Sequence, residues 1–204
     1  MEFGPGEFLP LRGLAVVLTV LLAGSVAVAA ATLVLPLAHL NAPAWQIAIY
    51  VRGLVVSSRV GMAATVIVFL IWFHRARINA ERHGWRQRRA RAWTFWGWII
   101  PIASLWIPFQ LMGDIWRAGL PPARRSRTAW LPVLWWISWL LATARATWAV
   151  PPDGWVSFTC YAIAGLTLIA IVRTVSTGPV GSPGTGADEP FSTACSHLAA
   201  TSSI

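Results

Sequence analysis

Few side chains of this chain are capable of catalysis or metal binding, and those few are scattered. The two cysteines, Cys160 and Cys195, lie in an apolar run and in a polar tail, where we expect free thiols without a chemical role. Metal sites need clustered His, Cys or carboxylate ligands, whereas the histidines are widely separated: His39, His74, His83 and His197. Neither a phosphate-binding glycine loop nor a nucleophile elbow is present. We therefore expect no catalytic residue, no metal ion, no cofactor and no enzymatic activity.

Charged residues inside apolar segments are the remaining candidates for a functional site. They are Arg59, Asp114 and Arg145. A charge within a membrane-spanning helix costs about 2.5–3.5 kcal/mol on insertion scales, so it is a functional candidate by default. Each arginine either extends its side chain to the outer membrane surface or binds an anionic headgroup or small anion. For Asp114 we expect a structural ion pair with Arg117 or with arginines of the preceding loop.

The segment that carries Asp114, WGWIIPIASLWIPFQLMGDIWRAG, poses the main question of topology. Residues 95–112 are 18 residues without a charge, and a span needs about 20 apolar residues. Pro101 and Pro108 interrupt them, and each proline removes a backbone N–H and clashes with the preceding turn. Residues 94–117 therefore form a broken segment that either crosses the membrane or enters it and returns.

Composition places the chain among membrane proteins. Hydrophobic residues make up 56% of it and charged residues only 11%, against about 25% charged residues in soluble domains. Four apolar runs are predicted to span the membrane, at about 14–35, 53–73, 129–149 and 155–172. The first run also offers a signal-peptidase site at Ala27-Val28-Ala29, but it exceeds the apolar region of a signal peptide, about 7–15 residues. We favour a retained helix.

The segments outside these runs complete the predicted organisation. Residues 1–13 form the N-terminus, and residues 14–175 form the membrane domain. Residues 36–50 are of mixed character and are predicted to be a loop with a short interfacial helix. Residues 176–204 are rich in Gly, Ser, Thr, Pro and Ala, a composition that is typical of a disordered tail.

Two patterns within the runs indicate helix packing. Gly53, Ser57 and Gly61 recur every four residues, so they share one helix face and allow another backbone to approach closely. Three tryptophans near the middle of the third run either fill the core between helices, which we favour, or form a wall for ligand stacking: Trp135, Trp136 and Trp139.

The distribution of arginine decides between the topologies. All 16 basic residues are arginine, and arginine-rich loops stay on the cytoplasmic side. If residues 94–117 return to their side of entry, Arg12, Arg173, the seven arginines of 75–91 and the four of 117–127 are all cytoplasmic, and Arg52 alone is outside. If they cross, 8 arginines are inside and 6 outside. The first arrangement agrees better with the rule.

The predicted fold is therefore an all-α integral membrane protein of the cell membrane, with four transmembrane helices and a proline-broken, re-entrant or interfacial segment. Five spans are the alternative. The four-span topology places both termini in the cytoplasm. It also holds Asp114 at the cytoplasmic face and Arg59 in the outer half, so we expect no salt bridge between them. Arginine without lysine, together with the abundance of Ala, Gly and Pro, indicates a GC-rich bacterial genome.

The order of motifs resembles the actinobacterial multi-pass membrane family catalogued as domain of unknown function 4328. Its pattern matches Trp72, Arg75, Ala76, Arg77, Asn79 and Ala80, then Trp98, Pro101, Leu105, Trp106 and Pro108, and finally Trp116, Arg117 and Ala118. Ser104 stands where the pattern has asparagine, so a hydroxyl replaces an amide that would tie the broken backbone together. The resemblance covers residues 11–173 and implies no activity, substrate or cofactor.

Three classes of function remain. The first is a structural or regulatory membrane component that docks partners, and its arginine loops would contact anionic lipid headgroups; the partner is a membrane protein or a second copy of the chain. The second is a small transporter or channel subunit that uses residues 94–117 as a pore element. An enzyme is the weakest, because no catalytic set of residues stands out. The net charge of +9 suits a lipid surface, and we expect no nucleic acid partner.

Overall fold

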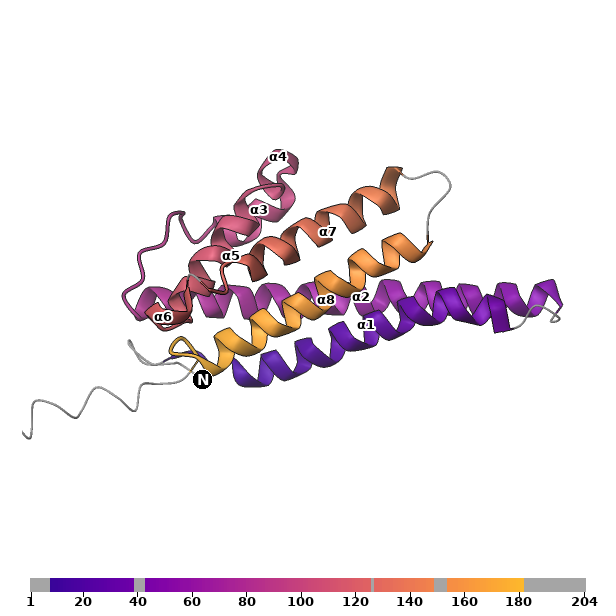
Figure 1. Cartoon of the computed structure of the whole chain (residues 1–204), viewed down its shortest axis with the longest axis horizontal. Helices are drawn as coiled ribbons and strands as arrows, with labels where there is room; N and C mark the ends of the chain where they lie inside the picture. The colour runs from indigo at the N-terminus through magenta and orange to yellow at the C-terminus, as the bar shows by residue number, and fades with distance from the viewer. Residues whose placement is uncertain (1–7, 39–42, 126, 149–153, 182–204) are drawn as a thin grey trace, which may run out of the picture.

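The computed structural model describes residues 8–38, 43–125, 127–148 and 154–181, and all regular secondary structure in these ranges is helical (Figure 1). The elements are α1 (Arg12–Ala38), α2 (Ala44–Arg82), α3 (Trp93–Ile99), α4 (Pro101–Ser104), α5 (Ile107–Ala118), α6 (Pro122–Arg125), α7 (Trp130–Trp148) and α8 (Gly154–Thr177). The all-α class predicted from the sequence is thus confirmed for the described residues.

Four long helices run along the molecule, and the shorter ones gather toward one end. α1 packs against α2 and α8, and α7 packs against α8. α1 begins, and α2 and α8 finish, at the end of the bundle where α6 lies (Figure 1). The loop 83–92 joins α2 to α3 at this same end. We call it the arginine end, because the arginine-rich segments 75–91 and 117–127 both lie there.

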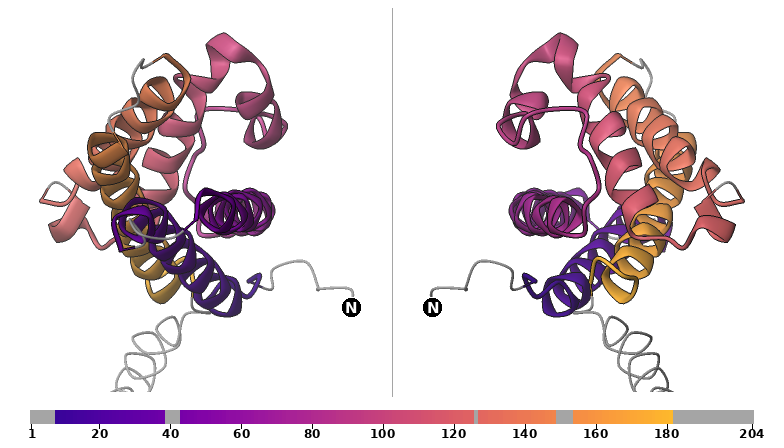
Figure 2. Two further views of the ribbon diagram at one scale, coloured as in Figure 1. Left: turned by 90° about the vertical axis from the view of Figure 1, so that its right-hand side faces the viewer. Right: turned by 90° about the vertical axis from the view of Figure 1, so that its left-hand side faces the viewer.

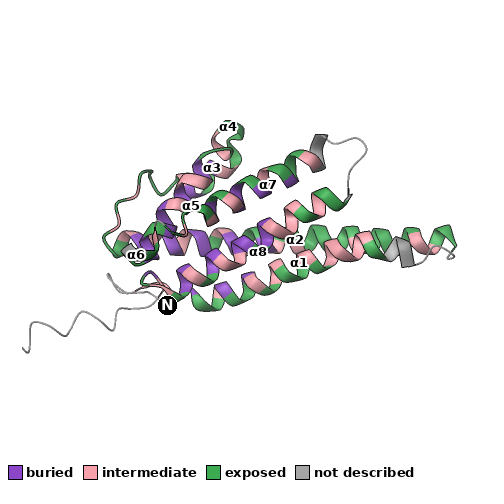
Figure 3. Ribbon diagram, in the orientation of Figure 1, coloured by how far each residue is buried: buried purple, intermediate pink, exposed green. Residues whose placement is uncertain are grey.

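Three helices are long and apolar enough to cross a membrane: Arg12–Val34 of α1, Ala44–Arg82 of α2 and Trp155–Thr177 of α8. The pair α3 and α4–α5 adds a fourth candidate if it is a single broken span. α7 occupies Trp130–Trp148, where the sequence predicts a span at 129–149. Val60 and Leu166, on α2 and α8, are more than 60% exposed, and Figure 3 shows exposed residues along much of the long helices. An apolar exterior on several long helices is the surface of a multi-pass membrane protein.

The connection between the first two helices is shorter than the sequence predicts. α1 continues through Pro36 to Ala38, and α2 begins at Ala44 rather than near Gly53. Pro43 stands just before α2, and its carbonyl accepts hydrogen bonds from the N–H groups of Gln46 and Ile47. The next residues, AWQIAIY, contain neither Gly nor Pro, so nothing opposes a helix there. The predicted loop at 36–50 is therefore wrong at 36–38 and 44–50, where the chain continues α1 and begins α2 in place of a separate short interfacial helix, and residues 39–42 lie outside the described residues.

The broken segment leaves the arginine end along one side of the bundle and returns to that end. α3 leads away from that end, α4 forms the turning point and α5 leads back (Figures 1 and 2). The axes of the two arms are bent by 107°. The backbone is extended at Ile100, directly before Pro101, because a residue before proline avoids the helical region. Both prolines then begin a helix, Pro101 in α4 and Pro108 in α5.

Backbone groups at the break are satisfied by nearby partners. The N–H of Ser104 donates to the carbonyl of Ile100 at 2.7 Å, and the Ser104 hydroxyl donates to the carbonyl of Pro101 at 2.7 Å. The indole Nε1 of Trp136, on α7, donates to the carbonyl of Leu105 at 3.2 Å. Non-helical backbone at membrane depth requires such cover by protein. Ser104 supplies part of it, as the sequence predicts, and Trp136 supplies more.

The core is concentrated near the arginine end. Fully buried side chains come from α1, α2, α5 and α8; examples are Leu18, Trp72, Leu111 and Val172. Trp135 and Trp136 are 3% and 5% exposed and stack in a tilted pair with ring centroids 5.3 Å apart. The core-filling role predicted for these two tryptophans is confirmed.

Two features of the long helices differ from the prediction: the small-residue face of α2 and the end of α8. Gly53 and Ser57 are exposed, and only Gly61 of the small-residue face approaches α1, with its nearest atom the Ser25 Oγ. Ser176 and Val180, assigned from the sequence to a disordered tail, are buried at 1% and 0% exposure. Ordered packing thus continues to residue 181, and residues 182–204 lie outside the described residues.

Gly84 ends α2 in a left-handed conformation, with φ of +80°. The N–H of Trp85 donates to the Ala80 carbonyl and the N–H of Gly84 donates to the Glu81 carbonyl, both at 3.0 Å, which together form a Schellman motif. The helix stop that the sequence predicts at Gly84 is confirmed.

We expect Gly84→Ala to lower the free energy of unfolding in detergent by about 1–2 kcal/mol, because a side chain disfavours this conformation. Gly113→Ala is the matched control: Gly113 lies within α5, and an added methyl group there would meet no atom within 4 Å. Thermal unfolding checks both variants. Equal unfolding temperatures for the two would contradict this account of the turn.

Candidate functional site

The last turns of α2 carry the sequence motif WFHRARINAE and form the centre of the arginine end. Most of the motif is buried: Trp72, Phe73, Ala76, Arg77, Asn79 and Ala80. A helix that is buried around most of its circumference must contact several segments at once. The motif's polar side chains therefore have to find partners within the protein.

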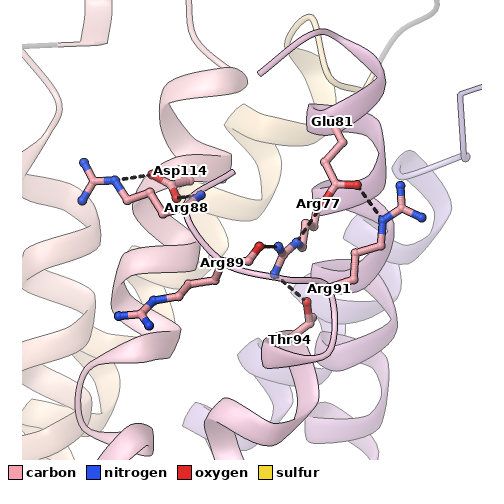
Figure 4. Close-up of polar contacts among 7 residues, drawn as sticks. All are labelled: Arg77, Glu81, Arg88, Arg89, Arg91, Thr94 and Asp114. Atoms are coloured by element: carbon pink, nitrogen blue, oxygen red, sulfur yellow. Dashed lines mark hydrogen bonds and ion pairs between the residues drawn. The ribbon is translucent and has the colours of Figure 1, made fainter. Parts of the chain in front are cut away.

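Arg77 is the most constrained of these polar residues, since its side chain is 0% exposed. Its Nε donates to a Glu81 carboxylate oxygen at 3.3 Å, and its Nη1 donates to the Thr94 hydroxyl at 3.1 Å. Its Nη2 donates to the backbone carbonyl of Arg89 (Figure 4). The guanidinium thus joins α2, the loop 83–92 and the first turn of α3.

Glu81 extends this network toward solvent. Its second carboxylate oxygen accepts from Nε of Arg91 at 2.6 Å. Arg91 is 65% exposed and Glu81 22% exposed, while Arg77 is fully buried. The carboxylate therefore lies between a buried and a solvated guanidinium, and the pairing of Arg77 with Glu81 expected from their i,i+4 spacing is confirmed.

Asn79 and Trp72 fix the two ends of the described chain. The Asn79 side-chain amide donates to the carbonyls of Leu9 at 2.8 Å and Val180 at 2.9 Å, and its oxygen accepts from the Leu9 N–H at 2.9 Å. The Trp72 indole donates to the Ser176 hydroxyl at 3.0 Å. One face of α2 therefore holds both the segment before α1 and the segment that ends α8.

Asp114 is the second buried charge, at 2% exposure. Its Oδ1 lies 3.2 Å from Nη1 of Arg117 and 3.5 Å from Nε of Arg88, and its Oδ2 accepts from the Arg88 N–H at 3.4 Å. The two arginine side chains are 46% and 59% exposed. The structural ion pair predicted for Asp114 is confirmed, and Figure 4 shows Arg88 reaching it from the loop.

The remaining motif residues have less direct roles. Arg75 donates to the Pro10 carbonyl at 3.5 Å, and Trp106 is 60% exposed near the turning point of the broken segment. Trp116 is 2% exposed, and its indole nitrogen has no hydrogen-bond partner among the described residues. Thr94 and Ser176 were not singled out from the sequence, because a single hydroxyl residue gives no pattern; both partner a motif residue across a large sequence separation.

The other two charged candidates lie outside this network. Arg59 is exposed and lines a cavity of about 550 Å³ between α1, α2, α7 and α8. Arg145 is partly exposed in the last turn of α7. In the described chain the ion pairs of Asp114 are formed with Arg88 and Arg117, so the structure does not bring Arg59 to it.

No group of three or more His, Cys, Asp or Glu side chains within the described ranges is arranged to hold a metal ion. Cys160 is a partly buried free thiol on α8. Cys195, His39 and His197 lie outside the described residues.

Long apolar helices, a bent helix pair and a buried polar network at one end together define a helical multi-pass membrane protein. Residues 38–177 match the family described as Domain of unknown function (DUF4328), and the chain belongs to this family. No curated protein and no solved structure matches the chain. The first and last parts of the motif expected for this family lie at the arginine end, and its middle part, from Trp98 to Pro108, forms the turning point of the broken segment.

We expect Asn79→Ala to lower the free energy of unfolding by at least about 1–3 kcal/mol, because backbone groups of Leu9 and Val180 lose a buried partner. The N-terminal segment should also become more sensitive to protease. Gln110→Ala is the control, since the Gln110 amide makes no hydrogen bond with any described residue. Protease sensitivity equal to that of the control would show that Asn79 does not hold this segment.

For Asp114 we expect that removing its two cationic partners lowers the stability more than removing the partners together with the carboxylate charge. The double variant Arg88→Gln/Arg117→Gln leaves a buried carboxylate without a cation and should cost about 3–5 kcal/mol. Adding Asp114→Asn to it should restore most of this loss, because no buried charge then remains. Unfolding midpoints in detergent measure both. A triple variant less stable than the double variant would contradict a structural ion pair.

Proposed function

We propose that this protein is a structural or regulatory membrane component that docks through its arginine end onto anionic groups. The observation that carries the proposal is the gathering of exposed arginines on the segments of that end: Arg82, Arg86, Arg88, Arg89, Arg91, Arg117, Arg124, Arg127 and Arg173. Guanidinium groups bind phosphate and carboxylate through paired hydrogen bonds. Lipid headgroups and acidic partner segments both present these groups.

The proposal includes a topology. Arginine-rich segments stay on the cytoplasmic side, so the arginine end faces the cytoplasm, and both described ends of the chain lie with it. α1, α2, α7 and α8 then cross the membrane, and the broken segment enters from the cytoplasmic side and returns. Support comes from Asp114 near the end of α5, which pairs with Arg88 of the loop before α3. The two arms of the segment therefore start and finish close together.

The arginines of the arginine end differ in whether their side chains have a partner within the described protein, and this difference supports docking further. The guanidinium of Arg77 binds partners inside the protein, and Arg88, Arg91 and Arg117 each have a carboxylate partner. The side chains of Arg86, Arg89, Arg124 and Arg127 have no hydrogen bond or ion pair with any described residue. These four are available to an external anion, and each is worth about 1 kcal/mol near an anionic surface.

A small transporter or channel subunit is the second candidate, and the bend of 107° between the arms of the broken segment favours it. Discontinuous helices bind ions and substrates in many transporters. The turning point from Ile99 to Trp106 carries no charged side chain, and Ile102 there is 85% exposed. An apolar, exposed tip suits contact with lipid better than the lining of an ion path. A proteoliposome flux assay with chloride and potassium separates the two candidates.

We expect the quadruple variant Arg86→Gln, Arg89→Gln, Arg124→Gln and Arg127→Gln to lose most of its enrichment of anionic lipid. The protein is reconstituted with phosphatidylglycerol and phosphatidylcholine and purified in mild detergent, and the retained lipids are quantified by mass spectrometry. Arg52→Gln, at an exposed arginine far from the arginine end, is the control. An unchanged phosphatidylglycerol fraction in the quadruple variant would remove lipid docking from the proposal.

The topology is tested by labelling single cysteines in a Cys160→Ser/Cys195→Ser background. With a membrane-impermeant maleimide on intact cells, we expect Trp45→Cys to label and Arg89→Cys to label only after permeabilisation. Arg124→Cys discriminates, because four spans place it inside and five spans place it outside. A reporter fused after Arg173 should likewise be active in the cytoplasm. Labelling of Arg124→Cys on intact cells would establish five spans instead.

A further inference from the structure

A cavity of about 550 Å³ opens between α1, α2, α7 and α8, away from the arginine end. Arg59, Ser58, Trp139 and Tyr161 are among its lining residues. A narrower space of about 90 Å³ adjoins it and shares Ser25, Met62, Trp139 and Tyr161 with its lining. The wide part lies within the usual size range of ligand sites, about 300–1,000 Å³.

The two parts of this cavity differ in chemistry. The narrow part is lined by aliphatic and aromatic side chains, including Leu22, Val26, Phe69 and Trp98, and reaches the aromatic core. The wide part contains the only charged residue of either lining, Arg59. A ligand that matches both parts has an anionic head and an apolar chain.

Arg59 has no partner within the part of the chain that the structure describes. Its guanidinium makes no ion pair or hydrogen bond with any residue that the structure describes. Its neighbours on α2 include Val55, Val56 and Val60, which are 45%, 58% and 65% exposed and apolar. A cation surrounded by apolar surface at membrane depth is costly until an anion neutralises it.

Several hydroxyl groups of the cavity already donate hydrogen bonds within the protein, which leaves few donors besides Arg59 for an anion. The hydroxyls of Ser25, Thr32 and Ser58 donate to carbonyls of their own helices at 2.7–2.8 Å, so their protons are already used. The Tyr161 hydroxyl donates to the sulfur of Met62 at 2.9 Å. A thioether is a weak acceptor, and an anionic oxygen would replace it readily. Tyr161 is therefore a second donor available to an anion, and the Ser157 hydroxyl, which also lines the wide part, is a third.

The depth of Arg59 also suits a lipid-like ligand. It lies 14 residues before Phe73, the end of the apolar run, which is about 21 Å along a helix. With the hydrocarbon layer about 30 Å thick, Arg59 is roughly 9 Å inside the boundary opposite the arginine end. An anionic head can meet Arg59 there while its chain extends inward to the narrow part.

We propose that this cavity binds an anionic amphiphile, with a carboxylate or phosphate head on Arg59 and Tyr161 and a hydrocarbon chain in the narrow part beside Trp98 and Trp139. Free fatty acids and anionic phospholipids share this chemistry. The site is independent of the docking proposed for the arginine end, because no residue of either cavity lining belongs to the arginine network described there.

The test uses full-length protein in phosphatidylcholine nanodiscs and a palmitic acid that carries a photoactivatable diazirine in its chain. We expect saturable cross-linking to peptides of α2, α7 and α8 that line the cavity. Excess palmitate should abolish it, whereas palmityl alcohol, which lacks the charge, should compete at least about tenfold more weakly. Competition by phosphatidylglycerol at lower concentration than palmitate identifies a phospholipid as the ligand; the reverse order identifies a fatty acid.

The variants test the charge directly. Arg59→Gln should weaken palmitate binding about tenfold or more, since a charge-assisted hydrogen bond is lost, and Arg59→Lys should retain most of it. Arg52→Gln, an exposed arginine on the same helix outside both linings, should bind as the unmodified protein does. Because Arg59 is exposed, all three variants should keep the unfolding temperature.

Three results would overturn the proposal. Equal competition by palmitate and palmityl alcohol, or unchanged binding by Arg59→Gln, would show that no anionic head is recognised. Full competition by inorganic phosphate alone would show that the chain is not. None of these results changes the lipid enrichment of the arginine end, so failure here is distinguishable from failure of the proposed docking.

Discussion

The arrangement of the arginine end depends on satisfying one buried guanidinium. Arg77 is fully buried, and its three partners belong to α2 itself, to the loop 83–92 and to the first turn of α3. Helices in a membrane gain little hydrophobic stabilisation from each other, so polar contacts and close packing hold them together. An unpaired charge at this position would cost several kcal/mol. The loop therefore has to fold back across α2, and this placement directs α3 into the bundle.

A second buried charge completes the closure of the same loop from the other side. Arg88 follows Gly84 by four residues and reaches Asp114 near the end of α5. The loop is thus held by Arg77 near one arm of the broken segment and by Asp114 near the other. This contact buries the carboxylate of Asp114 but leaves the guanidinium groups of Arg88 and Arg117 in solvent, so the two cations are not desolvated. The hairpin of α3 to α5 is set by these two charges as much as by its prolines.

Patterns among residues close together in the sequence predicted much of this structure. Several of the features that were missed depend on contacts between residues far apart in the sequence. The two proline breaks, the helix stop at Gly84 and the neutralisation of Asp114 follow from residues close together in the sequence. The hydrogen bonds of Asn79 to Leu9 and Val180 span 70 and 101 residues, and no local pattern indicates them. Ser176 for this reason looked like part of a polar tail. The start of α2 was missed because Asn41, Pro43 and Gln46 suggested a loop, although nothing in the residues that follow Pro43 opposes a helix.

The length of α2 has a consequence for the membrane in which the protein resides. The part of α2 before the arginine end, from Ala44 to Phe73, has 30 residues and extends about 45 Å, roughly one and a half times a hydrocarbon layer of about 30 Å. Together with α1 it projects beyond the ends of α7 and α8 (Figure 1). The projecting turns expose Trp45, Ile49 and Tyr50 at 63%, 63% and 58%, and aromatic rings of this kind prefer the headgroup layer. Such a helix relieves hydrophobic mismatch by tilting or by thickening the surrounding bilayer. The thickness of the membrane therefore influences the angle between the pair α1–α2 and the pair α7–α8.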